Sequence, residues 1–288
     1  MMERHFVKAT ITIPEEQQPL VIACVECPSF LGAEQSGDVL TLWFETDTPS
    51  HEPIAEYLSR RLGDIADVTE RCTIETVPHY DWHAQWQASL TPVTIGDRLV
   101  VLPGESFQPA APATTSTTIT IVIEPKMAFG TGHHPTTQMC AELLLDVVQQ
   151  GEQWLDIGTG SGLLAIVAGA AGARRVLAID NDPGAIAEAT ENVRRNGYAG
   201  IVEPIVADIA SFHRQPMDGI VANMYSTILE REMPRLHRMI RVGGHLIASG
   251  ILHYQAPIVE RIASDVGFES RTRLERGEWV ALDFVRKR

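Results

Sequence analysis

Short apolar runs alternate with longer amphipathic segments over the second half of the chain. From Thr136 onward, the short runs predict strands at Gln153–Ile157, Arg175–Ile179, Val202–Val206, Gly219–Ala222 and Gly244–Ala248. The longer segments have helical spacing and predict helices at Thr137–Val148, Leu163–Ala171, Pro183–Asn196, about Ile228–Ile240 and Ala256–Val266. Strands separated by helices of about 10 to 15 residues are typical of βαβ units, so we expect a doubly wound, mostly parallel sheet.

The end of the chain has a different pattern. Phe268–Leu274 and Trp279–Val285 are strand-like runs joined by Glu275–Glu278, a short turn with one glycine. Such a pair predicts a hairpin. We therefore expect an α/β fold with a seven-stranded sheet, mostly parallel, that is closed by an antiparallel strand.

The first part of the chain predicts a smaller, separate α+β domain. Val7–Ile13 and Val39–Glu45 are strand-like, and a helix with apolar spacing from Ile54 to Leu62 opens at Ser50, which can cap it. Further on, Asp81–Trp86 carries two tryptophans four residues apart, which share one face of a helix. We predict an N-terminal domain at 1–78, a linker helix region at 79–96 and a larger domain at 97–288.

Two more strand-like runs, Arg98–Leu102 and Thr118–Ile123, open the larger domain. Between them, Pro109–Ser116 has turn composition without hydrophobic periodicity, which predicts a surface loop.

Composition and charge narrow the function classes. The 288 residues are 44% hydrophobic, enough for an α/β domain and a smaller companion. No apolar window reaches the roughly 18 residues of a membrane span, and residues 1–6 do not resemble a signal peptide, so we expect a cytoplasmic enzyme with no membrane partner. The formal charge of −14 argues against broad phosphate-backbone binding and suits a basic protein partner better.

The cysteines and histidines do not predict a metal site. Cys24 and Cys27 form a C-x-x-C pair, but Cys72 and Cys140 do not supply a second pair at ligand spacing, so free thiols are expected. His133 and His134 are adjacent, and adjacent side chains on a turn rarely converge on one ion.

A glycine-rich turn carries the clearest chemical signal. Trp154–Ile157 is an apolar strand that runs into Gly158–Gly162, where glycine occupies alternate positions. Glycines there allow a sharp turn and a close approach of the backbone to a ligand. A dinucleotide-binding fingerprint needs glycine or alanine where Leu163 stands, which argues against a dehydrogenase.

Two aspartates flank this turn in the predicted fold. Asp156 precedes the turn, and Asp180 ends the next strand, where an acid accepts hydrogen bonds from ribose hydroxyls. A bare βα turn with a helix-capping aspartate is the alternative.

This arrangement resembles the class I S-adenosylmethionine-dependent methyltransferases. The resemblance implies that the turn with Gly158 and Gly160 passes the methionine moiety, and that Asp180 holds the ribose. It also implies that Asp208, after the third strand, neighbours the adenine; a helix N-cap is the alternative for Asp208.

Several segments are similar to the ribosomal protein L11 methyltransferase family. They are Asp81–Trp86, Met127–Thr137, Val221–Tyr225, Ser249–Leu252 and Gly277–Trp279. Carried over by position, the family's cofactor-binding residues correspond to Thr137, Gly158, Asp180 and Asn223. The chain departs from the family pattern at Glu124–Lys126, where Asp-Pro-Gly is common, and at Pro103–Glu105, where Pro-Ser-Trp is usual. Those departures concern loop geometry and not cofactor binding.

The resemblance implies a function. In this family an N-terminal module captures ribosomal protein L11, and the catalytic domain methylates its α-amino group and lysine side chains with S-adenosylmethionine. We expect the chain to act as a monomer, without direct nucleic acid binding.

Asn223 suits methylation of an amine. The nucleophile must be a neutral amine, and a carboxylate beside it would stabilise the ammonium form. A neutral amide carbonyl can instead accept an amine N–H and orient the lone pair, so we expect Asn223 to be catalytic; a strand-end cap is the bland alternative. The sequence Asn223-Met224-Tyr225 also lacks the Pro-Pro that follows this position in many enzymes that methylate base nitrogens or glutamine amides.

Other functions stay open at this point. The same catalytic domain could serve a different protein lysine or a small amine, although a small-molecule enzyme has less need of an N-terminal module. A cofactor sensor without catalysis is disfavoured by Asn223, and an RNA methyltransferase by the net charge and the absence of a basic aromatic patch.

Overall fold

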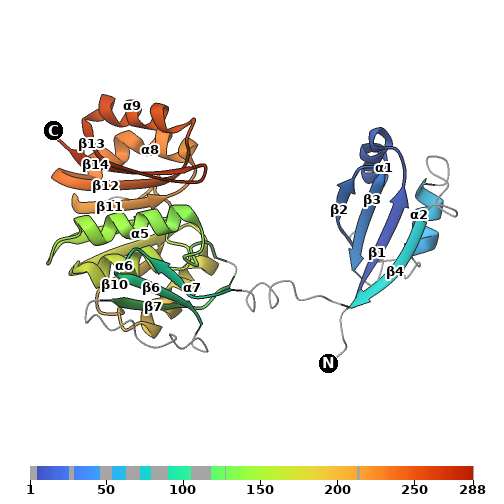
Figure 1. Cartoon of the computed structure of the whole chain (residues 1–288), viewed down its shortest axis with the longest axis horizontal. Helices are drawn as coiled ribbons and strands as arrows, with labels where there is room; N and C mark the ends of the chain where they lie inside the picture. Colours follow the sequence, from blue (N-terminus) through green and yellow to red (C-terminus); the bar gives the residue numbers. More distant parts are fainter. Residues whose placement is uncertain are drawn as a thin grey trace. The chain divides into compact units, whose positions relative to one another are not determined.

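The computed structural model describes residues 5–25, 29–45, 54–62, 72–78, 90–104, 118–126, 128–212 and 215–287. The chain divides into two compact units, Met1–Gln85 and Trp86–Arg288. Figure 1 shows the elements of both units.

The N-terminal unit is an antiparallel sheet with helices against one face. Its strands, in the order β2-β3-β1-β4, are β1 (His5–Thr12), β2 (Phe30–Ser36), β3 (Val39–Glu45) and β4 (Cys72–Pro78). The helices are the 3-10 turn η1 (Glu15–Gln17), α1 (Gln18–Cys24) and α2 (Ile54–Leu62). Alternate residues of β1 and β3 are buried together with one stripe of α2, because a strand exposes successive side chains on opposite faces. This packing gives the unit its own core.

The sequence predicts only part of this unit. The two central strands and the helix over Ile54–Leu62 were expected, whereas β2, β4 and α1 were not. The residue predicted to cap the helix, Ser50, lies outside the described residues. Both missed strands lie at the edges of the sheet and are largely exposed, so they carry no strict alternation of apolar and polar residues.

The second unit contains the expected seven-stranded, mostly parallel sheet that an antiparallel strand closes. Its strand order is β10-β9-β8-β11-β12-β14-β13. The strands are β8 (Gln153–Ile157), β9 (Arg175–Asp180), β10 (Val202–Val206), β11 (Met217–Asn223), β12 (Ile240–Leu252), β13 (Phe268–Arg276) and β14 (Trp279–Arg286). The pairs from β10 to β12 are parallel, and β14 pairs antiparallel with both β12 and β13.

Helices cover both faces of this sheet. They are α5 (Pro135–Val147), α6 (Leu163–Ala171), α7 (Pro183–Arg195), α8 (Ser226–Met239) and α9 (Ala256–Val266). Side chains of α5 and α6 share one core with Trp154 of β8, while α8 and α9 share the other core with Leu155. Consecutive residues of the same strand thus serve opposite faces, as a doubly wound fold requires. None of the described helices is long and apolar enough to cross a bilayer.

A small third sheet packs beside α5 and α6. It consists of β5 (Val93–Ile95), β6 (Leu99–Pro103) and β7 (Ile119–Ile123), with β6 parallel to β7. The strand β5 was not predicted, and it corrects the linker helix region at 79–96, whose last residues form a strand. The rest of that region, 79–89, and the loop predicted at Pro109–Ser116 lie outside the described residues.

Candidate functional site

A pocket of about 520 Å³ lies at the carboxyl ends of the parallel strands. The chain winds from β8 toward β9 on one side and continues through β11 and β12 on the other, so the pocket lies where the strand order reverses. Open α/β sheets bind ligands at such a switch point. The lining residues are Ala128, Phe129, His134, Thr136, Gly158, Gly160, Asp180, Asp182, Ala185, Asn223, Met224, Tyr225, Gly250 and Trp279.

A second hollow of about 200 Å³ adjoins the pocket and shares Gly158, Asp180 and Met224 with it. Asp208 lines this smaller hollow together with apolar residues of β8, β9 and the chain after β10, including Ile157, Ile179 and Ile209. The two hollows are therefore neighbouring parts of one site, with Asp180 in the lining of both.

The glycine turn forms the floor of the pocket. Gly158 and Gly160 have φ angles of +69° and +52°, a backbone region that other residues rarely adopt. The amides of Gly158 and Thr159 donate to the carbonyl of Ile179, at 2.9 and 3.0 Å, which ties the turn to the end of β9. A Cβ on Gly160 would lie only 2.4 Å from the carbonyl oxygen of Phe129. The turn therefore needs glycine both for its dihedral angles and for its close neighbours.

Asp180 stands between the two hollows at the end of β9. Its Oδ2 accepts a hydrogen bond from the amide of Gly160 at 3.1 Å, and its Oδ1 accepts one from the amide of Asp182 at 3.0 Å. Each carboxylate oxygen has two lone pairs, so both can still accept from a ligand hydroxyl. This geometry fits the predicted ribose contact and also holds the turn.

Asp156 lies beneath the turn and not in the pocket. It is 1% exposed, and its Oδ2 accepts a hydrogen bond from the Thr159 hydroxyl at 2.6 Å. Burial raises the pKa of this carboxyl to about 7, against the opposing effect of its hydrogen bonds from Thr159 and the Ala165 amide. The side chain supports the turn from inside the core.

Asn223 lies at the carboxyl end of β11, in the pocket wall. Its amide nitrogen donates to the hydroxyl of Thr137 at 3.3 Å, which leaves the carbonyl oxygen as the other polar end of the side chain. Thr137 is fully buried in the first turn of α5 and does not line the pocket, so its contact in this structure is with Asn223. The two residues, far apart in sequence, were both predicted, but their direct pairing was not.

Asp208 follows β10 and is not a helix N-cap. Its Oδ1 accepts from the amide of Ala210 at 2.7 Å, and the described residues after it form turns that lead to β11. The alternative interpretation of a helix cap is therefore wrong, and the residue stays a predicted neighbour of the adenine.

Three aromatic rings form one wall of the pocket. The ring centroid of His134 lies 5.4 Å from that of Phe129 and 5.0 Å from that of Trp279, both in edge-to-face arrangements. Burial lowers the pKa of His134 although Glu278 acts in the opposite direction, so the imidazole is neutral near pH 7. Its Nδ1 accepts a hydrogen bond from the Thr136 amide and caps α5. The sequence motifs contain all three residues, but nothing local in the sequence indicated that they meet.

The described residues contain no cluster of three or more His, Cys, Asp or Glu side chains that could hold a metal ion. Cys24 and Cys72 are half-buried free thiols and Cys140 is a buried one, whereas Cys27 lies outside the described residues.

Comparisons with known proteins agree on one family. The family model described as ribosomal protein L11 methyltransferase (PrmA) matches residues 13–287. Proteins of that name from Desulforamulus reducens and Heliobacterium modesticaldum are 38% and 39% identical to this chain, over 71% and 70% of its length. The matches span 65% and 63% of those two relatives' own lengths. The protein from Azotobacter vinelandii is 35% identical over 85% of this chain and 80% of its own.

A solved structure has the same fold. The crystal structure of a ribosomal protein L11 methylase from Lactobacillus delbrueckii subsp. bulgaricus superposes with a TM-score of 0.62 at 30% identity. The match covers 69% of this chain and all of that one.

Proposed function

The chain belongs to the ribosomal protein L11 methyltransferase family, and we propose that it transfers methyl groups from S-adenosylmethionine to amino groups of ribosomal protein L11. The observation that carries this proposal is the pairing of Asn223 with Thr137. It fixes the amide nitrogen, so the carbonyl oxygen is the end that can accept an amine N–H.

The residues around the two hollows fit S-adenosylmethionine. Gly158 and Gly160 make a floor without side chains, which suits the methionine end of the cofactor. Asp180 would accept hydrogen bonds from the ribose hydroxyls, and the smaller hollow beside Asp208, which Ile157, Ile179 and Ile209 line in part, would take the adenine. When bound, the cofactor supplies an electrophilic methyl group on a positively charged sulfur.

The protein's own task is to admit a neutral amine and align it. A lysine with a pKa near 10.4 costs about 4.6 kcal/mol to deprotonate at pH 7, at 1.36 kcal/mol per pH unit. The wall of Phe129, His134 and Trp279 removes water from the amine, which disfavours its charged form. His134 is neutral, so it does not stabilise an ammonium ion either.

Asn223 would then orient the amine. Its carbonyl oxygen accepts one N–H and directs the nitrogen lone pair toward the methyl group, while Thr137 keeps the amide from rotating. In-line alignment and exclusion of water are the main sources of catalysis for such a displacement. We assign the amine specificity to this arrangement.

We assign recognition of L11 to the N-terminal unit. This assignment is supported by the unit's separate core and by a pocket in the second unit whose described lining residues all come from that unit. A chain that starts at Tyr80 should bind cofactor as the full-length enzyme does and lose most methylation of L11. Equal turnover of L11 by both forms would contradict the assignment.

The substrate is tested with a mixture of purified large-subunit ribosomal proteins. With labelled S-adenosylmethionine, label should be found on L11. Label on a different protein would favour a different lysine methyltransferase, and label only on added small amines would favour a small-molecule enzyme. Those are the two alternatives for the same catalytic site.

A further inference from the structure

Residues Ala128–Gly130, which we call the wall segment, lie directly against the glycine turn. The carbonyl of Phe129 accepts a hydrogen bond from the Ser161 amide at 2.9 Å, and the carbonyl of Gly130 accepts one from the Ser161 hydroxyl at 2.7 Å. Ala128 and Phe129 also line the pocket. The position of the wall segment therefore sets the width of the pocket above the turn.

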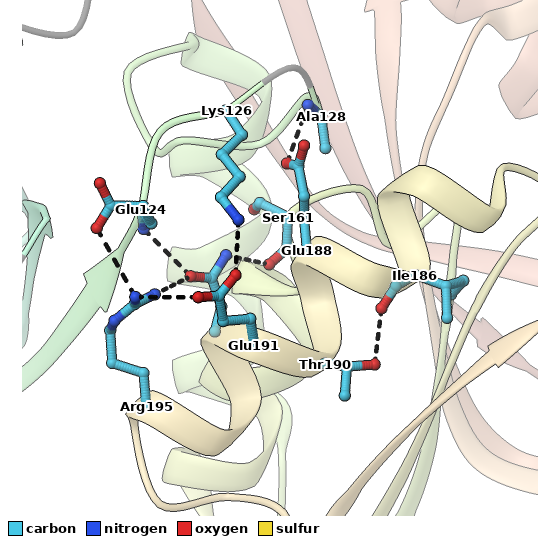
Figure 2. Close-up of polar contacts among 10 residues, drawn as sticks. Glu124, Lys126, Ala128, Ser161, Ile186, Glu188, Thr190, Glu191 and Arg195 are labelled. Atoms are coloured by element: carbon cyan, nitrogen blue, oxygen red, sulfur yellow. Dashed lines mark hydrogen bonds and ion pairs between the residues drawn. The ribbon is translucent and has the colours of Figure 1, made fainter.

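One face of α7 holds the chain that leads into the wall segment (Figure 2). Glu188, Glu191 and Arg195 follow one another at intervals of three and four residues and so project from the same side of the helix. Asn192, four residues after Glu188, lies on that side as well. The buried Asn192 connects the chain before the wall segment with the glycine turn. Its Oδ1 accepts a hydrogen bond from the Glu124 amide, and its Nδ2 donates one to the carbonyl of Ser161 in the turn.

Two charged contacts complete this attachment. Lys126 Nζ lies 2.6 Å from Oε2 of Glu191, and Oε2 of Glu188 accepts a hydrogen bond from the Ala128 amide at 3.1 Å. Figure 2 shows Lys126 reaching toward α7 and Glu188 reaching from α7 toward Ala128. The hydrogen bond with Glu191 raises the pKa of Lys126, and the same contact lowers the pKa of Glu191, so both groups are charged near pH 7.

The same helix also begins at the pocket. Asp182, its N-cap, and Ala185 line the pocket, and the Asp182 amide donates to Asp180. A ligand in the pocket would therefore contact α7 indirectly at two places. Asp180 is hydrogen-bonded to the start of the helix, and Phe129 follows Ala128, whose amide is bonded to Glu188.

We propose that Glu188 and Glu191 of α7, acting through Ala128 and Lys126, are positioning residues that hold the wall segment over the glycine turn and thereby slow the release of the cofactor. This inference rests on the proposed function, because it takes the ligand of the pocket to be S-adenosylmethionine or its product. Neither glutamate needs to touch the ligand.

The test measures dissociation constants and dissociation rates of S-adenosylhomocysteine for the full-length protein. Lys126→Met should raise the Kd about threefold, which lies within the range for an exposed ion pair. Glu188→Ala should raise it about tenfold, as for the loss of a hydrogen bond to a charged group. Lys126→Arg keeps the charge and should stay within about twofold of the wild type. Glu188→Gln keeps an acceptor without the charge, so its Kd should lie between those of the wild type and Glu188→Ala. For each variant, kcat at saturating cofactor should change less than the KM for cofactor.

Arg175→Met is the matched control. It removes an ion pair with Glu203 of similar exposure, on strands β9 and β10 but outside the pocket. In about 1 M salt the ratio between Lys126→Met and the wild type should approach one, because screening weakens the exposed pair. If Lys126→Met and Glu188→Ala bind as the control does, or lose thermal stability without a change in Kd, the positioning role is refuted. A wild type that does not bind the ligand would instead refute the proposed function, and this inference with it.

Discussion

Replacement of Gly160 by alanine tests the close contact between the glycine turn and the wall segment. The added methyl group has two costs. Alanine at φ +52° is in the left-handed region, which costs about 1 to 2 kcal/mol. The methyl carbon would also lie 2.4 Å from the Phe129 carbonyl oxygen, so one of the two segments must move by about 1 Å to restore van der Waals contact.

That movement would break the hydrogen bond from the Ser161 amide to the Phe129 carbonyl, worth about 1 kcal/mol. We expect Gly160→Ala to lose about 2 to 3 kcal/mol in total, shared between folding stability and ligand binding, and to weaken S-adenosylhomocysteine at least about tenfold. Urea unfolding and calorimetry measure the two parts.

Gly151→Ala supplies the control. Gly151 has φ +85° and no heavy atom within 4 Å of an added Cβ, so the substitution carries only the cost of the backbone conformation. It should lower stability and leave ligand affinity unchanged. Should Gly160→Ala bind ligand within about twofold of Gly151→Ala, the wall segment does not fix the pocket.

Three further variants test individual residues of the site. Asp180→Ala should weaken S-adenosylmethionine binding by about 1.5 to 3 kcal/mol, and unchanged affinity in calorimetry of the folded variant would rule out the ribose contact. Asp156 has a pKa raised from 3.8 to about 7 in the folded state, so its contribution to stability is full below pH 4 and is lost as the pH rises to 7. Asp156→Asn should lack that loss. From pH 4 to pH 7 its unfolding free energy should therefore rise relative to that of the wild type by about 4 kcal/mol, at 1.36 kcal/mol per pH unit. Parallel curves of unfolding free energy against pH would contradict the raised pKa of Asp156. Asn223→Asp should lower the methylation rate and move its pH optimum upward, because a carboxylate favours the ammonium form; an unshifted profile from about pH 6 to 10, with cofactor affinity measured alongside, would refute the role of the neutral amide.

The parts of the site predicted from sequence are those fixed by local rules. The turn at Gly158 and Gly160 is a contiguous motif, and Asp180 follows from its place at a strand end. Asn223 ends the fourth strand of the parallel set in chain order, and the carboxyl ends of parallel strands meet at one edge of the sheet. The glycine turn and Asp180 were expected at one site from the strand pattern, whereas Asn223 was assigned to it by the resemblance to the family.

The other parts depend on contacts between distant segments. Phe129 and Trp279 are separated by most of the larger unit, and only the folded chain brings both against His134. The ion pair between Lys126 and Glu191 likewise joins a loop to a helix, and no pattern in the sequence predicts that the two meet. Thr137 was expected at the cofactor, and its burial beneath Asn223 could not be inferred from helical spacing alone.

Edge strands were the main omission in the fold. Residues Phe30–Ser36 are largely exposed and include Gly32, and Val93–Ile95 is only three residues long. Their strand conformation comes from pairing with β3 and β6 and not from an apolar alternation of their own. The sequence signal is therefore weakest where the partner strand determines the structure.

The chemical identity of the methylated atoms tests the central claim most directly. Purified L11 is incubated with the wild-type enzyme and labelled S-adenosylmethionine, and its peptides are mapped by mass spectrometry. The account predicts label on amine nitrogens, the α-amino group and lysine side chains, and its loss with Asn223→Ala. Label on side-chain amides, carboxylates or guanidinium groups, or undiminished label with Asn223→Ala, would contradict the proposal that Asn223 orients a neutral amine.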